Sequence, residues 1–145
     1  MKTYKASHMI KSEDLNHHKN LYAGRAIEWM MEASFIAAAC EYKDKHGLLY
    51  KNTHQFDFFV PVDPGEIISY QSTVVRAGKT SFTIHIDLYS EDAGIVKAEG
   101  YTTFVTIDAN SKPVGHQITL DQTENQKELG WRTAAEGFFN GNKGT

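Results

Sequence analysis

Cysteine is almost absent from the sequence. Cys40 is the single cysteine among 145 residues, so no disulfide can form within one chain. This absence agrees with a reducing compartment, and we expect a cytoplasmic protein. Cys40 lies in an alanine-rich run, which favours a small core residue over a nucleophile.

Long apolar runs and an excess of basic charge are also absent. No stretch reaches the roughly 20 apolar residues of a membrane span, and residues 1–11 lack the apolar run of a signal peptide. The 15 Lys and Arg are outnumbered by 18 Asp and Glu, which gives a formal net charge of -3. We therefore expect neither membrane insertion nor nucleic-acid binding. The length fits one domain without a second catalytic module.

Proline is rare, and none of the 3 prolines lies between residues 22 and 45. Strong helix formers dominate that segment, which predicts one long helix from Tyr22 or Ala23 to about Lys45, ending near Gly47. Apolar residues cover much of its circumference, so we expect the helix to be enclosed. They include Ala26, Ile27, Trp29, Met30, Ala33, Ile36, Ala37 and Cys40.

Strand patterns dominate the rest of the chain. Strands are predicted over 3–10, 48–60, 67–76, 81–89 and 96–107. Apolar and polar residues alternate in 81–89, which indicates a sheet with one buried face, and the last three runs predict an antiparallel meander. Residues 1–120 are therefore predicted to form one α+β domain, a long central helix wrapped by a curved antiparallel sheet. Residues 121–145 are expected to form a tail with a short helix near 123–138 and a frayed end.

A polar loop containing Asn16, His17 and His18 lies directly before the predicted helix. The first N–H groups of a helix are unpaired and carry partial positive charge, so this junction suits a carbonyl oxygen or an anion. No His, Cys or Asp stands at a metal-ligand spacing from these residues, so we expect no metal site. His54 and His85 are interpreted as ordinary sheet residues.

Residues 16–24 read Asn-His-His-Lys-Asn-Leu-Tyr-Ala-Gly, and residues 28–33 read Glu-Trp-Met-Met-Glu-Ala. These segments resemble the opening motif and helix of the hot-dog acyl-CoA thioesterases, in the acyl-CoA hydrolase subgroup. Residues 56–66 resemble its second strand and turn, and residues 75–81 resemble its next turn. The likeness spans Met9 to Pro113 and implies a hot-dog fold.

The resemblance also implies a site shared between two chains. A loop Asn and an acidic helix residue would face each other across a dimer interface, and a helix-start N–H would hold the thioester oxygen. Asn16 falls on the family's Asn and Gly24 on its second Gly, whereas Ala23 replaces the first Gly and Met31 occupies the acidic position. A thioether cannot take a proton from water, so Met31 cannot act as the base.

Glu28 and Glu32 are the carboxylates that could replace the missing acid. At about 100° per residue, Glu28 lies about 60° from Met31 around the helix, and Glu32 lies about 100° away. If their shared face is enclosed, the two like charges would raise one pKa toward that of a general base. The alternative is that either carboxylate faces solvent or pairs with a cation such as Arg25.

Further residues are predicted to contact the substrate. His17 or His18 would bind the carbonyl, position water or only hold the loop together. An acyl pocket is predicted to be lined, besides core packing, by Trp29, Met31 and Phe35. Beside a glycine turn, four residues are predicted to contact the phosphates of coenzyme A, with a solvated hairpin tip as the alternative: Arg76, Lys79, Thr80 and Ser81.

The leading hypothesis is an acyl-CoA thioester hydrolase. Asn16 would orient a water, Glu28 or Glu32 would activate it, and the Gly24 N–H would stabilise the oxyanion without a metal or redox cofactor. The alternative is a non-hydrolytic hot-dog protein that binds an acyl-CoA or an acyl carrier and has lost its acid at Met31. A hot-dog dehydratase is a weaker third hypothesis, because no suitable His and acid arrangement is present. Each predicts a homodimer or a dimer-based higher oligomer, since pairing covers an edge strand.

Overall fold

A five-stranded antiparallel sheet forms the centre of the protein. This computed structural model describes residues 1–141. β3, β4 and β5 are consecutive neighbours, which confirms the predicted meander. The spatial order is β1-β3-β4-β5-β2, and the strands are β1 (Thr3–Met9), β2 (Leu48–Phe58), β3 (Ile67–Ala77), β4 (Ser81–Ser90) and β5 (Ile95–Thr106).

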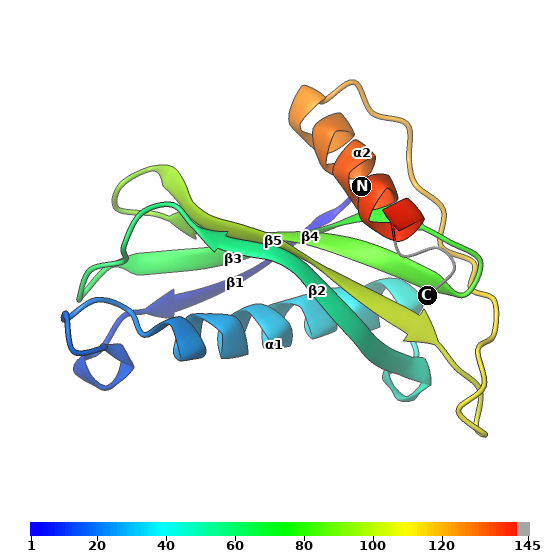
Figure 1. Cartoon of the computed structure of the whole chain (residues 1–145), viewed down its shortest axis with the longest axis horizontal. Helices are drawn as coiled ribbons and strands as arrows, with labels where there is room; N and C mark the ends of the chain where they lie inside the picture. The colour runs from blue at the N-terminus through cyan, green and yellow to red at the C-terminus, as the bar shows by residue number, and fades with distance from the viewer. Residues whose placement is uncertain (142–145) are drawn as a thin grey trace.

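The long helix α1 (Ala23–Tyr42) lies along one face of this sheet (Figure 1). Alanines at positions 26, 33 and 37 are buried and allow the helix to approach the strands closely, while Met30 fills the core between them. The helix ends three residues before the predicted Lys45, because Lys43 adopts a left-handed conformation with φ 63°. One long helix packed on a curved antiparallel sheet confirms the predicted α+β hot-dog fold.

The prediction that α1 is enclosed is wrong for a single protomer. Ile27, Phe35 and Ile36 are more than one-third exposed, and Cys40 is an exposed free thiol rather than a core residue. The sheet covers only one side of the helix, so apolar residues on its other sides remain at the surface.

A second helix, α2 (Gln126–Gly141), lies on the opposite face of the sheet from α1 (Figure 1). Ala135 packs against Val75 and Tyr101, with Trp131 and Phe138 beside it. This helix has the length that the predicted range 123–138 implies, but it begins and ends three residues later, and it forms part of the packed structure. β4 is consequently buried on both faces, so the prediction of one buried face is wrong. The frayed end that we predicted falls mostly on residues 142–145, outside the described residues.

β2 bends where it crosses β5. Its pairing register shifts between Tyr50 and Asn52 and again between His54 and Asp57. At the second shift Gly100 is needed for space, because a Cβ on it would lie 2.9 Å from the Cα of Phe56. The first shift reverses the alternation of side chains along β2. As a result Tyr50 and Thr53, three residues apart, both face α1.

Polar side chains are buried between the sheet and α2. The His85 ring stacks on Trp131 with centroids 3.8 Å apart, and its Nε2 lies 3.0 Å from the Glu99 carboxylate. Burial lowers the pKa of His85, an effect that Glu99 opposes. Burial, together with the charge of Glu99, raises the pKa of the neighbouring Asp87 to about 7, although Lys127 acts in the other direction. His85, interpreted from the sequence as an ordinary sheet residue, is therefore a buried side chain that contacts both α2 and Glu99.

The protonation of Asp87 predicts a pH-dependent stability. Its folded-state pKa of about 7 lies above the ordinary 3.8, so the proton stabilises the folded state fully below about pH 4, and this stability is lost as the pH rises to 7. Asp87→Asn stays neutral throughout. We expect the free energy of unfolding of the variant, relative to wild type, to rise between pH 5 and pH 7 by at most about 2.7 kcal/mol, which is about 1.36 kcal/mol for each of the two pH units. Urea titrations at several pH values measure this difference, and a constant difference would contradict it.

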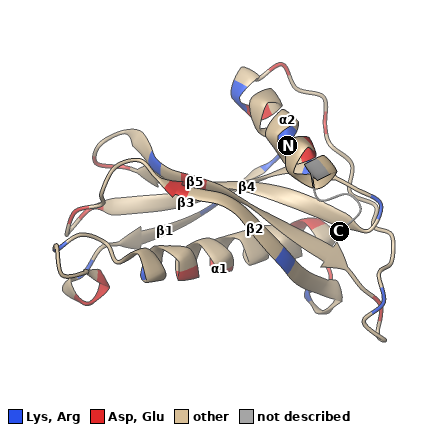
Figure 2. Ribbon diagram, viewed as in Figure 1, with Lys and Arg blue, Asp and Glu red and all other residues tan. Residues whose placement is uncertain are grey.

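Charged residues are spread over the molecule. Figure 2 shows Lys and Arg on helices, strands and loops rather than gathered on one element. Neither of the described helices has the length and apolar character needed to cross a membrane.

Candidate active site

A pocket of about 360 Å³ lies at the start of α1. One wall comes from the polar loop and contains Asn16, His18 and Asn20. The opposite wall is the segment 58–62, which leaves the end of β2 and exposes apolar side chains. A hydrogen bond from the Leu21 N–H to the Val62 carbonyl, 2.8 Å long, joins the two walls. The pocket thus places polar groups opposite an apolar surface.

Asn16 is held by its own loop. Its Oδ1 accepts hydrogen bonds from the backbone N–H groups of His18 (2.9 Å) and Asn20 (3.1 Å). These bonds fix the amide plane, and within residues 1–141 the Nδ2 group donates to no other protein atom. Asn16 can therefore donate a hydrogen bond to a carbonyl oxygen or to a water in the pocket.

The first turn of α1 has no side-chain cap. The carbonyl of Tyr22 accepts from the N–H groups of Arg25 and Ala26, both at 3.0 Å, whereas the N–H groups of Ala23 and Gly24 are bonded to none of the described residues. The Tyr22 ring lies against Gly24, so that a Cβ there would be 2.5 Å from the ring. Two free N–H groups at a helix start form a site for an oxyanion.

The two candidate carboxylates lie outside this pocket. The Glu28 side chain is 63% exposed, and within residues 1–141 its one polar contact is with Arg25, at 3.5 Å, which matches the alternative interpretation. Such exposed pairs are weak, so the Glu28 carboxylate remains accessible. Glu32 is also exposed. Burial lowers the pKa of His8 on β1, and the charge of Glu32 opposes this effect without cancelling it. Within one protomer neither carboxylate lines the pocket of Asn16.

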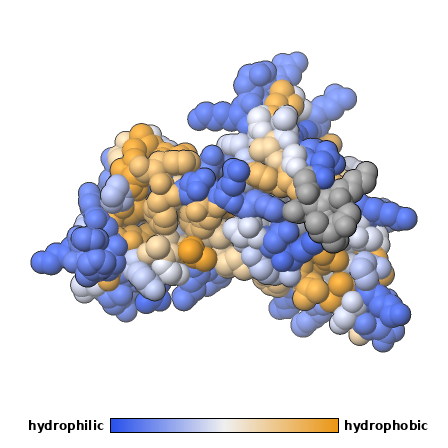
Figure 3. Space-filling view, in the orientation of Figure 1, coloured by the Kyte–Doolittle hydropathy of each residue, from blue (hydrophilic) through white to orange (hydrophobic). Residues whose placement is uncertain are grey.

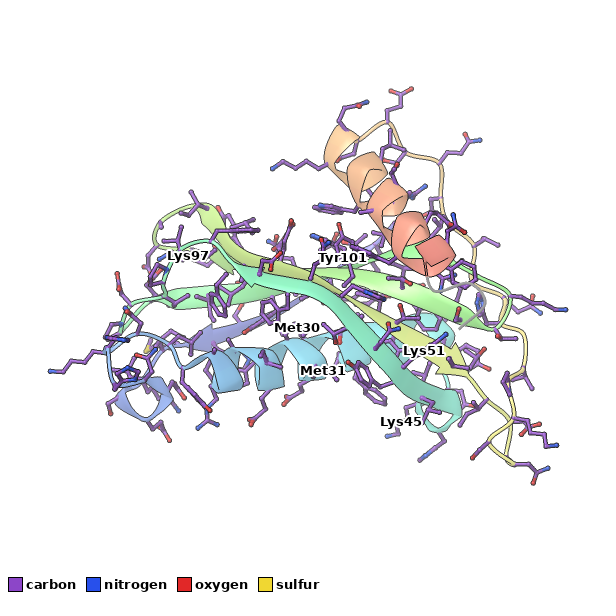
Figure 4. The ribbon with its side chains drawn as sticks, viewed as in Figure 1. Met30, Met31, Lys45, Lys51, Lys97 and Tyr101 are labelled. Atoms are coloured by element: carbon purple, nitrogen blue, oxygen red, sulfur yellow. The ribbon has the colours of Figure 1, made fainter. Side chains whose placement is uncertain are left out.

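Met31 faces β2 and contacts a side chain there that was not predicted as its neighbour. The Thr53 hydroxyl donates to the Met31 sulfur at 3.8 Å and shares a 2.6 Å hydrogen bond with the Tyr50 hydroxyl. Figure 4 shows Met31 on the side of α1 that faces β2. Thr53 and Tyr50 were not predicted as site residues, and the Thr53 hydroxyl contacts the side chain at the position where the resemblance implies an acid.

The predicted acyl pocket is divided between two sides of α1. Phe35 follows Met31 by one turn and packs against Phe104 at 6.0 Å, on the β2 side. Trp29 instead stacks on His8, with ring centroids 4.0 Å apart, on the β1 side. Within the described protomer, Trp29 and Phe35 therefore lie on different sides of α1.

The residues predicted to contact coenzyme A differ in their exposure to solvent. Arg76 is only 2% exposed: it donates to Thr83 and Ser81 at 2.9 and 2.7 Å, and the Phe139 ring covers it at 4.3 Å. Its guanidinium is thus held inside the protein, contrary to a role at the surface. Lys79 is exposed, and the Thr80 carbonyl is bonded to Thr106.

The rings of the two loop histidines, His17 and His18, lie side by side. Their rings lie 3.9 Å apart, and only His18 lines the pocket. In the part of the chain that the structure describes, no three His, Cys, Asp or Glu side chains are grouped closely enough to hold a metal ion.

An apolar surface runs along β2 and the adjoining side of α1. β2 is an edge strand, so its outer side has no strand partner among residues 1–141. Figure 3 shows apolar residues gathered on the face that presents this strand. We call this the β2 surface; it includes Ile27, Phe35, Leu49, Phe58 and Phe59, each more than one-third exposed. Exposed apolar surface beside an unpaired strand is typical of a contact with another protein chain.

Known proteins with similar sequences or folds are named as acyl-CoA hydrolases. The chain is 23% identical over 117 residues, 78% of its length and 67% of the relative, to YkhA of Bacillus subtilis (strain 168), named an uncharacterized acyl-CoA thioester hydrolase. The acyl-CoA hydrolase of Staphylococcus aureus, solved with butyryl coenzyme A and coenzyme A, superposes with a TM-score of 0.86 at 22% identity, covering 97% of this chain and 84% of that one.

A hexameric acyl-CoA thioesterase solved without ligand has the same fold, with a TM-score of 0.84 at 18% identity, covering 96% of this chain and 89% of that one. The family model of the thioesterase superfamily matches residues 18–97, more than half of the sequence. This segment contains the Asn16 pocket except for Asn16 itself, the whole of α1 and the strands β2, β3 and β4. The chain therefore belongs to the thioesterase superfamily.

Proposed function

We propose that the protein hydrolyses acyl-CoA thioesters, in an active site that a second copy of the chain completes. The observation that carries this proposal is the Asn16 pocket, which is lined by a fixed amide donor, by Ala23 at the start of α1 and by an apolar wall. The acyl-CoA hydrolases among its relatives support coenzyme A as the carrier of the acyl group.

The β2 surface supports assembly with a second copy. A chain that pairs with this edge would cover apolar side chains of both β2 and α1. It would also bring its own α1 close to the first chain's α1, so that a carboxylate on one helix could approach the pocket of the other chain. The hexameric relative supports dimers that assemble further.

In the proposed reaction, Asn16 of one chain and Glu28 of the other hold a water molecule. Glu28 takes a proton from this water as the water oxygen attacks the thioester carbonyl carbon, and the carbonyl oxygen becomes an oxyanion. The N–H groups of Ala23 and Gly24 stabilise that charge. When the C–S bond breaks, the coenzyme A sulfur receives the proton from Glu28, which leaves a free acid and coenzyme A. No metal or redox cofactor takes part.

Glu28 suits this role better than Glu32 does. It stands about 60° from Met31 around α1, on the side facing away from the core, whereas Glu32 is turned toward His8 and β1. His18 would contact the substrate from the loop, and Met31 and Phe35 would contact the acyl chain on the β2 side. The exposed Lys79 would contact a phosphate of coenzyme A.

A panel of short, aromatic and long acyl-CoAs tests the proposal. Release of the coenzyme A thiol is measured with a thiol reagent, using Cys40→Ser protein so that the exposed cysteine does not react. We expect turnover of at least one class. Absence of thiol release from every member of the panel would overturn the hydrolase proposal.

A second candidate is the acyl-CoA binding protein without hydrolytic activity, which the contact between Met31 and Thr53 favours. Met31→Asp separates the two functions. If Glu28 is the base, the new carboxylate attracts the water away from Glu28, and we expect kcat to fall at least about tenfold. Met31→Leu, which adds no charge, serves as the comparison. A wild-type protein without activity that gains hydrolysis through Met31→Asp would instead support the binding function.

A further inference from the structure

A buried ion pair lies behind the apolar wall of the Asn16 pocket. Lys97 of β5 is only 5% exposed, and its Nζ donates to the Glu66 carboxylate and to the Pro61 carbonyl, both at 2.9 Å. Figure 4 labels Lys97 at the end of the sheet where the β2–β3 connection runs. The Lys97 ammonium group thus joins β5 to the connection between β2 and β3.

Both oxygens of the Glu66 carboxylate are bonded. Oε1 accepts from the Ser90 hydroxyl, and Oε2 accepts from Lys97 and from the backbone N–H of Asp63. Burial alone would raise the pKa of Glu66, but the hydrogen bonds from Ser90, Asp63 and Lys97 outweigh it and lower the pKa. Glu66 is therefore a carboxylate anion that balances the buried ammonium group.

Lys97 holds the pocket wall through its main chain as well. Its carbonyl accepts from the N–H groups of Phe59 (2.8 Å) and Val60 (3.4 Å), while its side chain holds Pro61. One residue thereby fixes three successive residues of the wall that faces Asn16. The next residue, Val62, is bonded to Leu21 at the foot of the polar loop.

Stability alone is a weak reason for this arrangement. The cost of removing two charges from water roughly cancels their attraction, so an apolar pair of similar size would stabilise the fold as well. What an apolar pair could not supply is a directional bond to the Pro61 carbonyl. We propose that Lys97 is a positioning residue, which sets the distance between the apolar wall at Phe58–Val60 and Asn16 and thereby selects the acyl chains that fit. This inference rests on the proposed acyl-CoA site.

Lys97→Met tests the inference, because methionine keeps the length of the side chain but cannot bind Pro61 or Glu66. The KM and kcat of wild type and variant are measured over acyl-CoAs of increasing chain length. We expect KM for the preferred chain to rise about tenfold, kcat to change less than about threefold, and the preference among chain lengths to weaken. Lys5→Met is the matched control. Lys5 lies on β1, and its substitution removes an exposed ion pair of 2.8 Å with Glu91.

A folded Lys97→Met protein with wild-type KM values and an unchanged chain-length preference would overturn the inference. If this variant does not fold, because it leaves Glu66 without its cation, the double variant Lys97→Met with Glu66→Gln removes both charges and is held to the same expectation. Binding of a non-hydrolysable acyl-CoA thioether is a readout that does not need turnover. If wild type hydrolyses nothing, about tenfold weaker thioether binding by the variant still supports the role of Lys97, and equal binding overturns it.

Discussion

Replacing Asn16 with alanine is expected to lower kcat for acyl-CoA hydrolysis by about 100- to 1,000-fold, the usual effect of removing one donor from an oxyanion or water site. The reason is that Asn16 uses Oδ1 to hold its loop and keeps Nδ2 free for the pocket. Asn16→Asp is the matched control. It retains an acceptor for the loop and removes the donor, so we expect the same loss, measured as kcat at saturating substrate. Full activity of Asn16→Asp would show that Nδ2 has no part in the reaction.

Glu28→Gln is expected to reduce kcat by about 100- to 10,000-fold, because glutamine cannot accept the proton of the attacking water. The substitution keeps the size of an exposed side chain, so the thermal unfolding midpoint should hardly change. Glu32→Gln, four residues further along α1, should keep kcat within about threefold, since Glu32 is turned toward β1. The opposite result, with activity lost in Glu32→Gln and kept in Glu28→Gln, would mean that the base has been wrongly assigned.

The main elements of the fold could be predicted because local sequence and global packing agree. Residues 23–42 combine strong helix formers with small side chains, and the helix occupies almost the predicted range. Alternation placed Phe82, Ile84, Ile86 and Leu88 on one face of β4, and those four side chains form the core beneath α1. The order of strands and helix then left the hot-dog arrangement as the consistent solution.

Thr53 and Tyr50 were missed for a physical reason. In a regular strand, residues three apart face opposite sides, so alternation cannot place Tyr50 and Thr53 together. The register shift after Tyr50 reverses the alternation and brings both hydroxyls toward Met31. Such a bulge depends on the pairing with β5 rather than on the residues of β2 alone.

The outer face of the sheet was misjudged for a similar reason. Thr83, His85 and Asp87 are polar, which indicates a solvated face, yet α2 buries them. The residues of α2 form a mostly polar helix, and its few apolar side chains become informative only when the sheet beneath them is known. Arg76, predicted to bind coenzyme A, is held inside the protein by the same helix through Phe139.

The separation of Asn16 from Glu28 has another origin. Both belong to one motif in the sequence, but in the folded protomer only Asn16 lines the pocket, while Glu28 points into solvent from the outer side of α1. A sequence motif cannot show which of its residues act within one chain and which act between two. The exposed apolar residues of the β2 surface are the feature of the protomer that favours a site between chains.

Mixing two inactive variants tests this shared site most directly. Asn16→Ala and Glu28→Gln are each purified, then dissociated and reassociated together. If Asn16 of one chain works with Glu28 of its partner, half of the randomly formed dimers are mixed and each has one intact site of two, so about a quarter of the wild-type activity should return. A mixture that stays as inactive as its two parents would contradict a site shared between two chains.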